Sequence, residues 1–403
     1  MHWPIAFVQL FFTLGWTVYV LFLPGLLKQA GIDVAWLPWI LIVDQLLFAA
    51  ADLATGIWLD RSEQFLRMAG NGLAALVLAA CAVFALLPFL AHAVPAWLFV
   101  PALLVWVICS SVLRVPPLVL LAKYATAPQP AARTTMPAAA YLFGIGVAGA
   151  VAPYLTALLK NRDPLLPFLI ASVALAVTTL VLRRALTRAA SPPASFNTPA
   201  APTRFTIALP LLVAVGLFAF GMQIHAAVNS VRLFTRVAPD VPLEWLMPLF
   251  WAGFSVAMFP ASRWLARGTD HAGNLHAPAG NALWQAGLAG GIVLVACATA
   301  PPLPLLMALQ IVAGAAWAMI FLAAISTAAA LGRSGREGGW IGATLALMAL
   351  ATVGRIVLVL ALSPGNGGTA GRVIAEQLPW ISGVSWLVAV AVLALVSTRR
   401  RGG

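Results

Sequence analysis

Charged residues are scarce in this sequence. Asp, Glu, Lys and Arg together make up 8% of its 403 residues, whereas hydrophobic residues make up 62%. About a quarter of the residues of a typical soluble domain are charged, so a chain of this composition could not cover the surface of a soluble globule. It is therefore predicted to be an integral membrane protein.

Cysteines and clustered metal ligands are scarce as well. Cys81, Cys109 and Cys297 stand far apart inside apolar segments, without the spacing of a disulfide framework or a zinc site. His271 and His276 share a loop that offers no further ligand of the kind zinc requires. No metal, cofactor or catalytic residue is predicted, because no nucleophile and base converge in the pattern. An enzyme is therefore not expected.

Long apolar runs fill most of the chain. A helix needs about 20 apolar residues to cross a bilayer. Twelve runs of this kind span residues 5–26, 36–58, 68–90, 97–121, 135–158, 164–182, 206–231, 244–262, 280–299, 304–330, 338–362 and 379–398. The first run is longer than a signal-peptide core and follows no Lys or Arg, so it is predicted to remain as a helix. The predicted fold is all-α, with twelve transmembrane helices.

A tract rich in Ser, Pro and Ala interrupts the series after the sixth run. It includes Ser191-Pro192-Pro193, and this composition is typical of an extended, flexible linker. The chain is therefore predicted to comprise one six-helix bundle at 1–186, a linker at 187–204 and a second six-helix bundle at 205–403.

Basic residues are distributed unevenly between the two sides of the membrane. If the N-terminus is inside, fifteen of the 23 Lys and Arg residues fall on that side. Basic loop residues are retained on the cytoplasmic side, so both termini are predicted to be cytoplasmic, in the inner (plasma) membrane. This asymmetry explains the net charge of +12 and implies attraction to anionic lipid. No nucleic-acid partner is predicted.

The end of the second run combines small, acidic and basic residues. Gly56 is followed by Asp60 and Arg61, and a further base, Arg67, lies downstream. These residues resemble the signature between helices 2 and 3 of the major facilitator superfamily of secondary transporters. The resemblance implies two six-helix bundles around a binding site near mid-membrane, with a cytoplasmic gate at these four residues. The Gly-Arg-Arg that follows in that family is replaced here by Glu63-Gln64-Phe65.

The fifth run contains a second resemblance. Gly144, Gly146 and Gly149 have the spacing of a dinucleotide-binding fingerprint, but they lie in an apolar helix, where small residues allow close helix packing. Further along, Ala152-Pro153 resembles part of a Gly-Pro pattern on helix 5 of major facilitator antiporters, with Ala or Thr in place of each expected Gly. This resemblance implies an antiporter.

Ionisable residues within apolar runs are costly in a membrane and indicate functional positions. Asp44 and Asp52 lie eight residues apart, about 80° around one helix, so both can face inward. Asp52 and Arg114 of the fourth helix lie at about the same depth, which predicts an ion pair that either couples charge movement or only locks two helices together. Arg114 also resembles the helix 4 Arg of proton-coupled family members. Asp44 has no basic residue at its depth and is the candidate proton carrier.

Arg355, on the eleventh helix, leaves three interpretations open. It can bind an anionic group, or it can pair with an acid of the other bundle. Because it lies near a helix end, it can also extend its charged group to the membrane surface.

Polar and aromatic residues form stripes on four predicted helices. In the family that the sequence resembles, helices 1, 4, 7 and 10 line the central cavity, so these stripes are predicted to line it here. The stripes comprise Gln9, Thr13 and Trp16 on the first helix, Trp106 and Ser110 beside Arg114 on the fourth, His225, Asn229 and Arg232 on the seventh, and Gln310 with Trp317 on the tenth. For each single residue, hydrogen bonding or packing between helices is the alternative.

These features together predict a monomeric secondary transporter that works by alternating access. The scarcity of fixed charge in the predicted cavity favours a small organic solute, and the titratable candidates favour protons as the coupling ion. Proton-coupled export is the first hypothesis and proton-coupled uptake is the second. A non-transporting, major-facilitator-like scaffold or sensor is the alternative from a different class.

Overall fold

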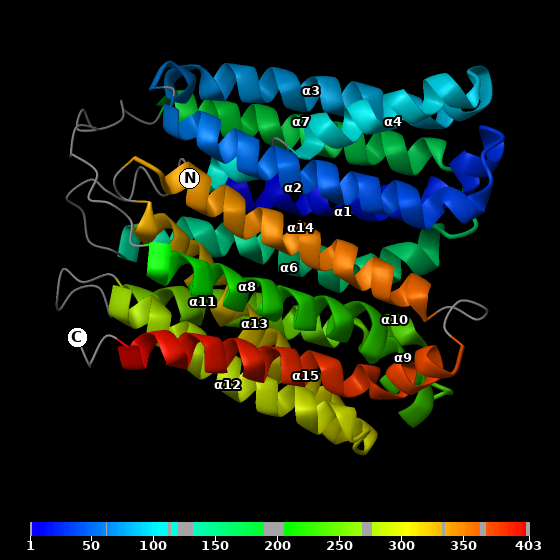
Figure 1. The fold of residues 1–403 in the computed structure, drawn as a ribbon. Helices are drawn as coiled ribbons and strands as arrows, with labels where there is room; N and C mark the ends of the chain where they lie inside the picture. The colour runs from blue at the N-terminus through cyan, green and yellow to red at the C-terminus, as the bar shows by residue number, and fades with distance from the viewer. Residues whose placement is uncertain are drawn as a thin grey trace.

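Long helices that lie side by side make up the structure (Figure 1). It is a computed structural model that describes residues 2–61, 63–111, 114–119, 132–188, 205–267, 276–332, 335–362 and 368–399. These residues contain helices and connecting turns but no strand.

Six spanning segments belong to the first half of the chain. Their helices are α1 (His2–Gln29), the 3₁₀ turn η1 (Val34–Trp36), α2 (Leu37–Arg61), α3 (Glu63–Ala93), α4 (Ala96–Ser111), α6 (Ala132–Leu159) and α7 (Leu165–Arg188). The fourth spanning segment continues past the end of α4 to Val119.

Six more spanning segments belong to the second half. Their helices are α8 (Phe205–Ile224), the π-helical turn η2 (His225–Asn229), α9 (Ser230–Val237), α10 (Leu243–Leu246), α11 (Pro248–Arg267), α12 (His276–Ala298), α13 (Leu303–Leu331), α14 (Glu337–Ala361) and α15 (Gly368–Arg399). In all, 12 segments of the described chain are long and apolar enough to cross a membrane. The predicted twelve-helix, all-α fold is therefore confirmed.

The helices group into two bundles. In the first, α1 packs against α6 and α7, and α3 packs against α4 and α7; in the second, α8 and α12 pack against α15, and α11 packs against α13. The bundles meet where α2 lies beside α14 and where α6 lies beside α11 (Figure 1). In Figure 1, α1 starts and α2 and α15 finish toward the left of the picture, at the same end of the molecule. We call this end, where α1 starts and α2 and α15 finish, the terminal end.

Glycines allow close contact between the bundles near the terminal end. A Cβ atom on Gly56 of α2 would collide with the backbone of Gly338 in α14, and one on Gly342 would collide with the backbone of Asp52. Small residues of this kind let helix backbones approach each other in a membrane. The two helices therefore touch through their main chains at this end.

The glycines of the fifth span serve the same purpose. Gly144 of α6 lies against the backbone of α1, whereas Gly146 and Gly149 lie against Phe254 and Trp251 of α11. This arrangement confirms the packing role that the sequence predicted for the three glycines. Because α6 contacts both α1 and α11, it ties the first bundle to the second.

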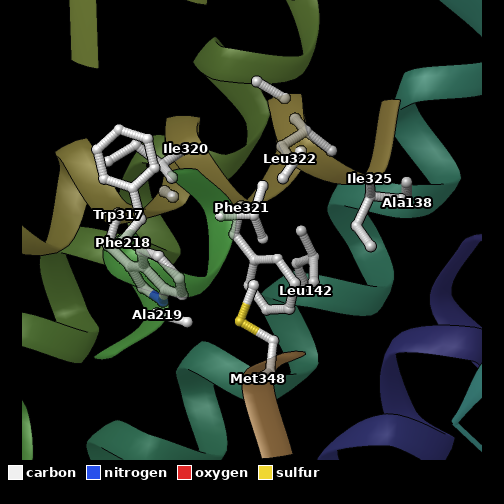
Figure 2. Close-up of a cluster of buried hydrophobic side chains, with 14 of the residues drawn as sticks. Ala138, Leu142, Phe218, Ala219, Trp317, Ile320, Phe321, Leu322, Ile325 and Met348 are labelled. Carbon is white, nitrogen blue, oxygen red and sulfur yellow. The ribbon is translucent and has the colours of Figure 1, made fainter. Parts of the chain in front are cut away.

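Aromatic and aliphatic side chains fill the interior of the second bundle. Figure 2 shows Trp317 and Phe321 of α13 packed with Phe218 of α8 and Met348 of α14. Leu142 of α6 belongs to the same cluster, so this core continues from the second bundle into the first. Between helices in lipid, such contacts stabilise through van der Waals packing rather than through removal from water.

Candidate functional site

A cavity of about 500 Å³ lies between the two bundles. Residues of α1, α2, α6 and α14 line it: Trp16, Thr17, Val20, Leu21, Leu41, Gln45, Thr156, Thr352, Arg355 and Ile356. The lining residues of α2 lie near its start, and those of α6 and α14 lie near the finish of each helix, so the cavity occupies the half of the molecule away from the terminal end. Its volume is in the range of small-molecule sites.

A buried pair of hydrogen-bonding groups lies beside this cavity. The Tyr19 hydroxyl of α1 donates to Asp44 Oδ2 of α2 at 2.7 Å, and both side chains are fully buried. The other carboxyl oxygen, Oδ1, has no hydrogen-bond partner in the described part of the chain. The next residue along α2, Gln45, lines the cavity. Asp44 thus has a neutral partner that sequence reasoning missed, and it forms no ion pair with any described base.

The predicted ion pair between the second and fourth spans is present. Arg114 Nη1 lies 3.2 Å from Asp52 Oδ2, with exposed fractions of 17% and 0% for the two side chains. The guanidinium of Arg114 also lies over the ring of Phe48, 5.0 Å from its centroid. Because the carboxylate is completely buried, the pair must offset a large desolvation cost. Its formation confirms the matched depth of the two residues; its role in coupling stays a prediction.

Arg114 lies at a bend, directly before the helical residues 115–119. Regular helix α4 ends at Ser111, and the Arg114 N–H donates to the Ser111 carbonyl at 3.2 Å. Residues 115–119 are helical again, and Pro116 and Pro117 lie in the first turn of this stretch, where proline is tolerated. The Tyr141 hydroxyl of α6 donates to the Arg114 carbonyl at 3.2 Å, which holds the irregular segment against the first bundle.

Asp60 joins the two bundles at the terminal end. Its carboxylate accepts hydrogen bonds from the backbone N–H groups of Gly338 at 2.8 Å and Gly339 at 2.7 Å, at the start of α14. These amides belong to the first turn of a helix, which lacks intrahelical partners and carries partial positive charge, so a carboxylate is favoured there. Arg61 is exposed, and the side chain of Arg67 lies outside the described residues.

The predicted residues of α1 and α4 lie together in the first bundle. Trp16 lines the cavity, and its ring stacks on Trp106 at a centroid distance of 5.8 Å. Gln9 Nε2 donates to Thr13 Oγ1 of its own helix at 3.2 Å, and Ser110 is buried. Of these five residues, Trp16 is the one that lines the cavity described here.

The predicted residues of the seventh and tenth spans lie inside the second bundle. His225 and Gln310 form a buried hydrogen bond of 3.0 Å between Nε2 and Oε1. Asn229 donates to the Leu378 carbonyl at 2.9 Å and to Ser382 Oγ at 3.1 Å. These contacts match the alternative considered for each residue, hydrogen bonding between helices. None of the three lines the cavity of about 500 Å³, nor does Trp317, which is buried in the core.

A π-helical turn in the seventh span changes which of its residues lie on the same face of the helix. The predicted stripe of His225, Asn229 and Arg232 assumed a regular α-helix, but His225–Asn229 forms a turn with i→i+5 geometry. Arg232 lies beyond the turn in α9 with an exposed side chain, and its Nη1 donates to the Ala375 carbonyl at 3.3 Å. No local sequence signal for the wider turn was recognised.

Similar structures exist, although sequence comparison finds no matching family model and no matching curated protein. The chain resembles the human organic anion transporter MFSD10 (TETRAN), with a TM-score of 0.68 and 14% identity over 97% of this chain and 98% of that one. It also resembles a bacterial homologue of the iron transporter ferroportin in an outward-facing state, with a TM-score of 0.69 and 15% identity over 98% of each chain. A structure of a bacterial ferroportin homologue in the outward-facing state with soaked iron is similar as well. Its TM-score is 0.69 and its sequence identity is 15%, over 98% of this chain and 99% of that one.

At these identities the likeness establishes the fold. The chain has the two-bundle, twelve-helix fold of major facilitator transporters, as the partial loop signature predicted.

Proposed function

We propose that this protein is a secondary active transporter that moves a small organic solute across the membrane by alternating access. The observation that carries the proposal is a cavity between two bundles that touch main chain to main chain at the terminal end. Alternating access requires a site between two halves that is closed toward one side at a time. Such a cavity has the volume, the apolar lining and the few polar groups of a small-molecule site.

The contact between α2 and α14 is the proposed gate. Opening the terminal end requires Gly56 to part from Gly338 and requires Asp60 to release two backbone N–H groups. Those bonds are reversible because water can replace the carboxylate at a helix start. In this proposal Arg61, the residue after Asp60, and Arg67, farther along the chain, complete the gate on the same side.

Proton coupling is proposed to involve three residues of the first bundle. Asp44 carries the proton, because its carboxyl group has one oxygen bonded to Tyr19 and one oxygen without a partner. The ion pair of Asp52 and Arg114 lies farther along α2, toward the gate. Proton release from Asp44 changes the charge of α2 beside the cavity, which can bias the two bundle arrangements.

The solute is proposed to be organic rather than a metal ion. The two similar transporters are named for organic anions and for iron. In the described part of this chain, no group of three His, Cys, Asp or Glu side chains could hold a metal ion. The cavity instead presents Trp16, Gln45 and threonine hydroxyls among aliphatic side chains, which suits an amphipathic molecule.

The proposed setting is the inner membrane, with both termini in the cytoplasm and anionic lipid around the basic loops. The terminal end then faces the cytoplasm, and the cavity lies in the outer half. Residues 187–204 link a bundle at 1–186 to one at 205–403, and the protein works as a monomer. Export in exchange for protons is preferred, because the α6 sequence resembles the antiporter pattern.

Proteoliposomes that contain a pH-sensitive dye test this function. Solutes that raise the unfolding temperature of the purified protein are candidate ligands, because they bind the folded state. Such a solute should move across the membrane only when protein is present and should drive protons in the opposite direction. Co-movement in the same direction would indicate symport, and a ligand that binds but drives neither solute nor proton flux would indicate a scaffold or sensor.

A further inference from the structure

Arg355 is a cation without a partner inside the cavity. It lines the cavity from α14, six residues before the helix ends at Ala361. Its Nε atom is buried and has no hydrogen-bond partner, and the guanidinium forms no ion pair with any described acid. The side chain is half-buried, and its buried Nε leaves part of the charged group unsatisfied where Arg355 lines the cavity.

The cavity around Arg355 offers nothing to neutralise it. No acidic side chain is among the lining residues. Asp44, one residue from the lining residue Gln45, uses Oδ2 to accept from Tyr19 and is itself fully buried. An unpaired charge at membrane depth is costly and normally meets a partner or a water-filled space. The missing partner here is an anion from outside the chain.

The other residues that line the cavity indicate the chemistry of the uncharged part of that anion. Trp16, Val20 and Leu21 present an aromatic ring and aliphatic groups from α1. Gln45 adds an amide from α2 that can donate a hydrogen bond. A single cation among apolar side chains favours a molecule with one negative charge and an apolar body, because a second charge would be buried without a counterion.

We propose that the cavity binds an amphipathic organic monoanion, with its carboxylate held by the guanidinium of Arg355 and its apolar body packed against Trp16. Binding of this anion does not depend on the proposed transport function. Movement of the bound anion across the membrane does depend on it. Arg presents a planar fork of N–H groups that matches a carboxylate in two parallel hydrogen bonds. The proposal names the solute class and the residue of the second bundle that holds it.

Matched acids and amides test the assignment. Benzoate, 2-naphthoate and hexanoate differ from benzamide, 2-naphthamide and hexanamide in charge but little in shape. At least one of the three acids should raise the unfolding temperature of the wild-type protein more than its amide does. If no acid exceeds its amide, the anion site is refuted.

Two variants assign the effect to Arg355. Arg355→Gln should weaken binding of the acid by about 10- to 100-fold, the loss expected when charge-assisted hydrogen bonds are removed, and should leave binding of the amide unchanged. Arg162→Gln is the matched control, because Arg162 is exposed in the loop after α6 at the same end of the molecule. Without ligand, Arg355→Gln should be at least as stable as wild type, because no acid loses its partner. A marked loss of stability would show that Arg355 pairs within the chain and would overturn the proposal.

Lipid and transport measurements separate the remaining outcomes. If phosphatidylglycerol in place of phosphatidylcholine abolishes the effect of the acid in wild type, the anion held by Arg355 is a lipid phosphate and the organic monoanion is refuted. If the acid binds through Arg355 but is not moved into proteoliposomes, the site stands and the transport function fails. If an acid and its amide are transported equally, and equally by Arg355→Gln, the transport function stands and the anion site is refuted.

Discussion

The ion pair of Asp52 and Arg114 is the strongest test of how the first bundle is held together. Asp52→Asn removes one charge and leaves Arg114 beside a neutral amide, whereas Arg114→Gln leaves a fully buried carboxylate without its cation. Removing one partner of a buried pair costs about 3–5 kcal/mol, because the other charge stays desolvated. The double substitution removes both charges of the pair, so it should cost clearly less than the two single substitutions together.

The size of the coupling follows from the geometry. The N–O distance is 3.2 Å, which places the charge centres about 4 Å apart, and at an effective dielectric constant of about 20 their attraction is about 4 kcal/mol. Arg114 is 17% exposed, so solvent screens part of this attraction. We expect a measured coupling of about 1–3 kcal/mol. The contact of Arg114 with Phe48 is worth a further 0.5–2 kcal/mol, roughly, but it is lost in both Arg114 variants and does not enter the coupling.

Equilibrium unfolding in mixed micelles measures the four free energies of this double-mutant cycle. The double variant should be destabilised by about 1–3 kcal/mol less than the sum of the two single variants. Strict additivity of the two single changes would show that the residues do not interact and would remove the basis for assigning them a joint role.

Two further predictions concern orientation and packing. In a variant without native cysteines, cysteine at Ser195 or Gly402, both outside the described residues, should react only with reagent on the cytoplasmic side; labelling of either from outside intact cells would overturn the orientation. Gly56→Ala should lower stability by about 1–3 kcal/mol, because its Cβ would collide with the Gly338 backbone, whereas Gly15→Ala should be nearly neutral, because no atom lies within 4 Å of the added carbon. Equal unfolding temperatures for the two alanine variants would argue against close packing of α2 on α14.

Features that depend only on position along a helix, such as the length of a span or the depth of a residue in the membrane, were predictable from the sequence. Span count and span limits follow from runs of apolar residues, since each helix must cover the same bilayer thickness. The pairing of Asp52 with Arg114 followed from depth alone, because the rise of about 1.5 Å per residue converts sequence position into depth.

Features that depend on how helices are rotated and tilted were not predictable. Depth places Tyr19 opposite Asp44, but only the packing of α1 on α2 turns the hydroxyl toward the carboxylate. Asp60 finds its partners 278 and 279 residues away, at the start of α14, and no local pattern reports such a contact. The stripe of His225 and Asn229 depended on regular α-helical periodicity, which the π-helical turn interrupts.

The most direct test of proton-coupled transport compares two modes of solute movement in proteoliposomes that contain wild-type protein or Asp44→Asn. The substitution fixes a neutral group at the proposed proton site, where the Asp44 carboxyl accepts from Tyr19 and has one oxygen without a partner. Wild type should accumulate solute when a pH gradient is imposed and should exchange labelled for unlabelled solute when the compartments are equal. Asp44→Asn should lose gradient-driven accumulation and keep exchange, because exchange requires movement of the bundles but no net proton transfer. Full gradient-driven accumulation by Asp44→Asn would contradict the assignment of Asp44, and the absence of both modes in wild type would contradict transport itself.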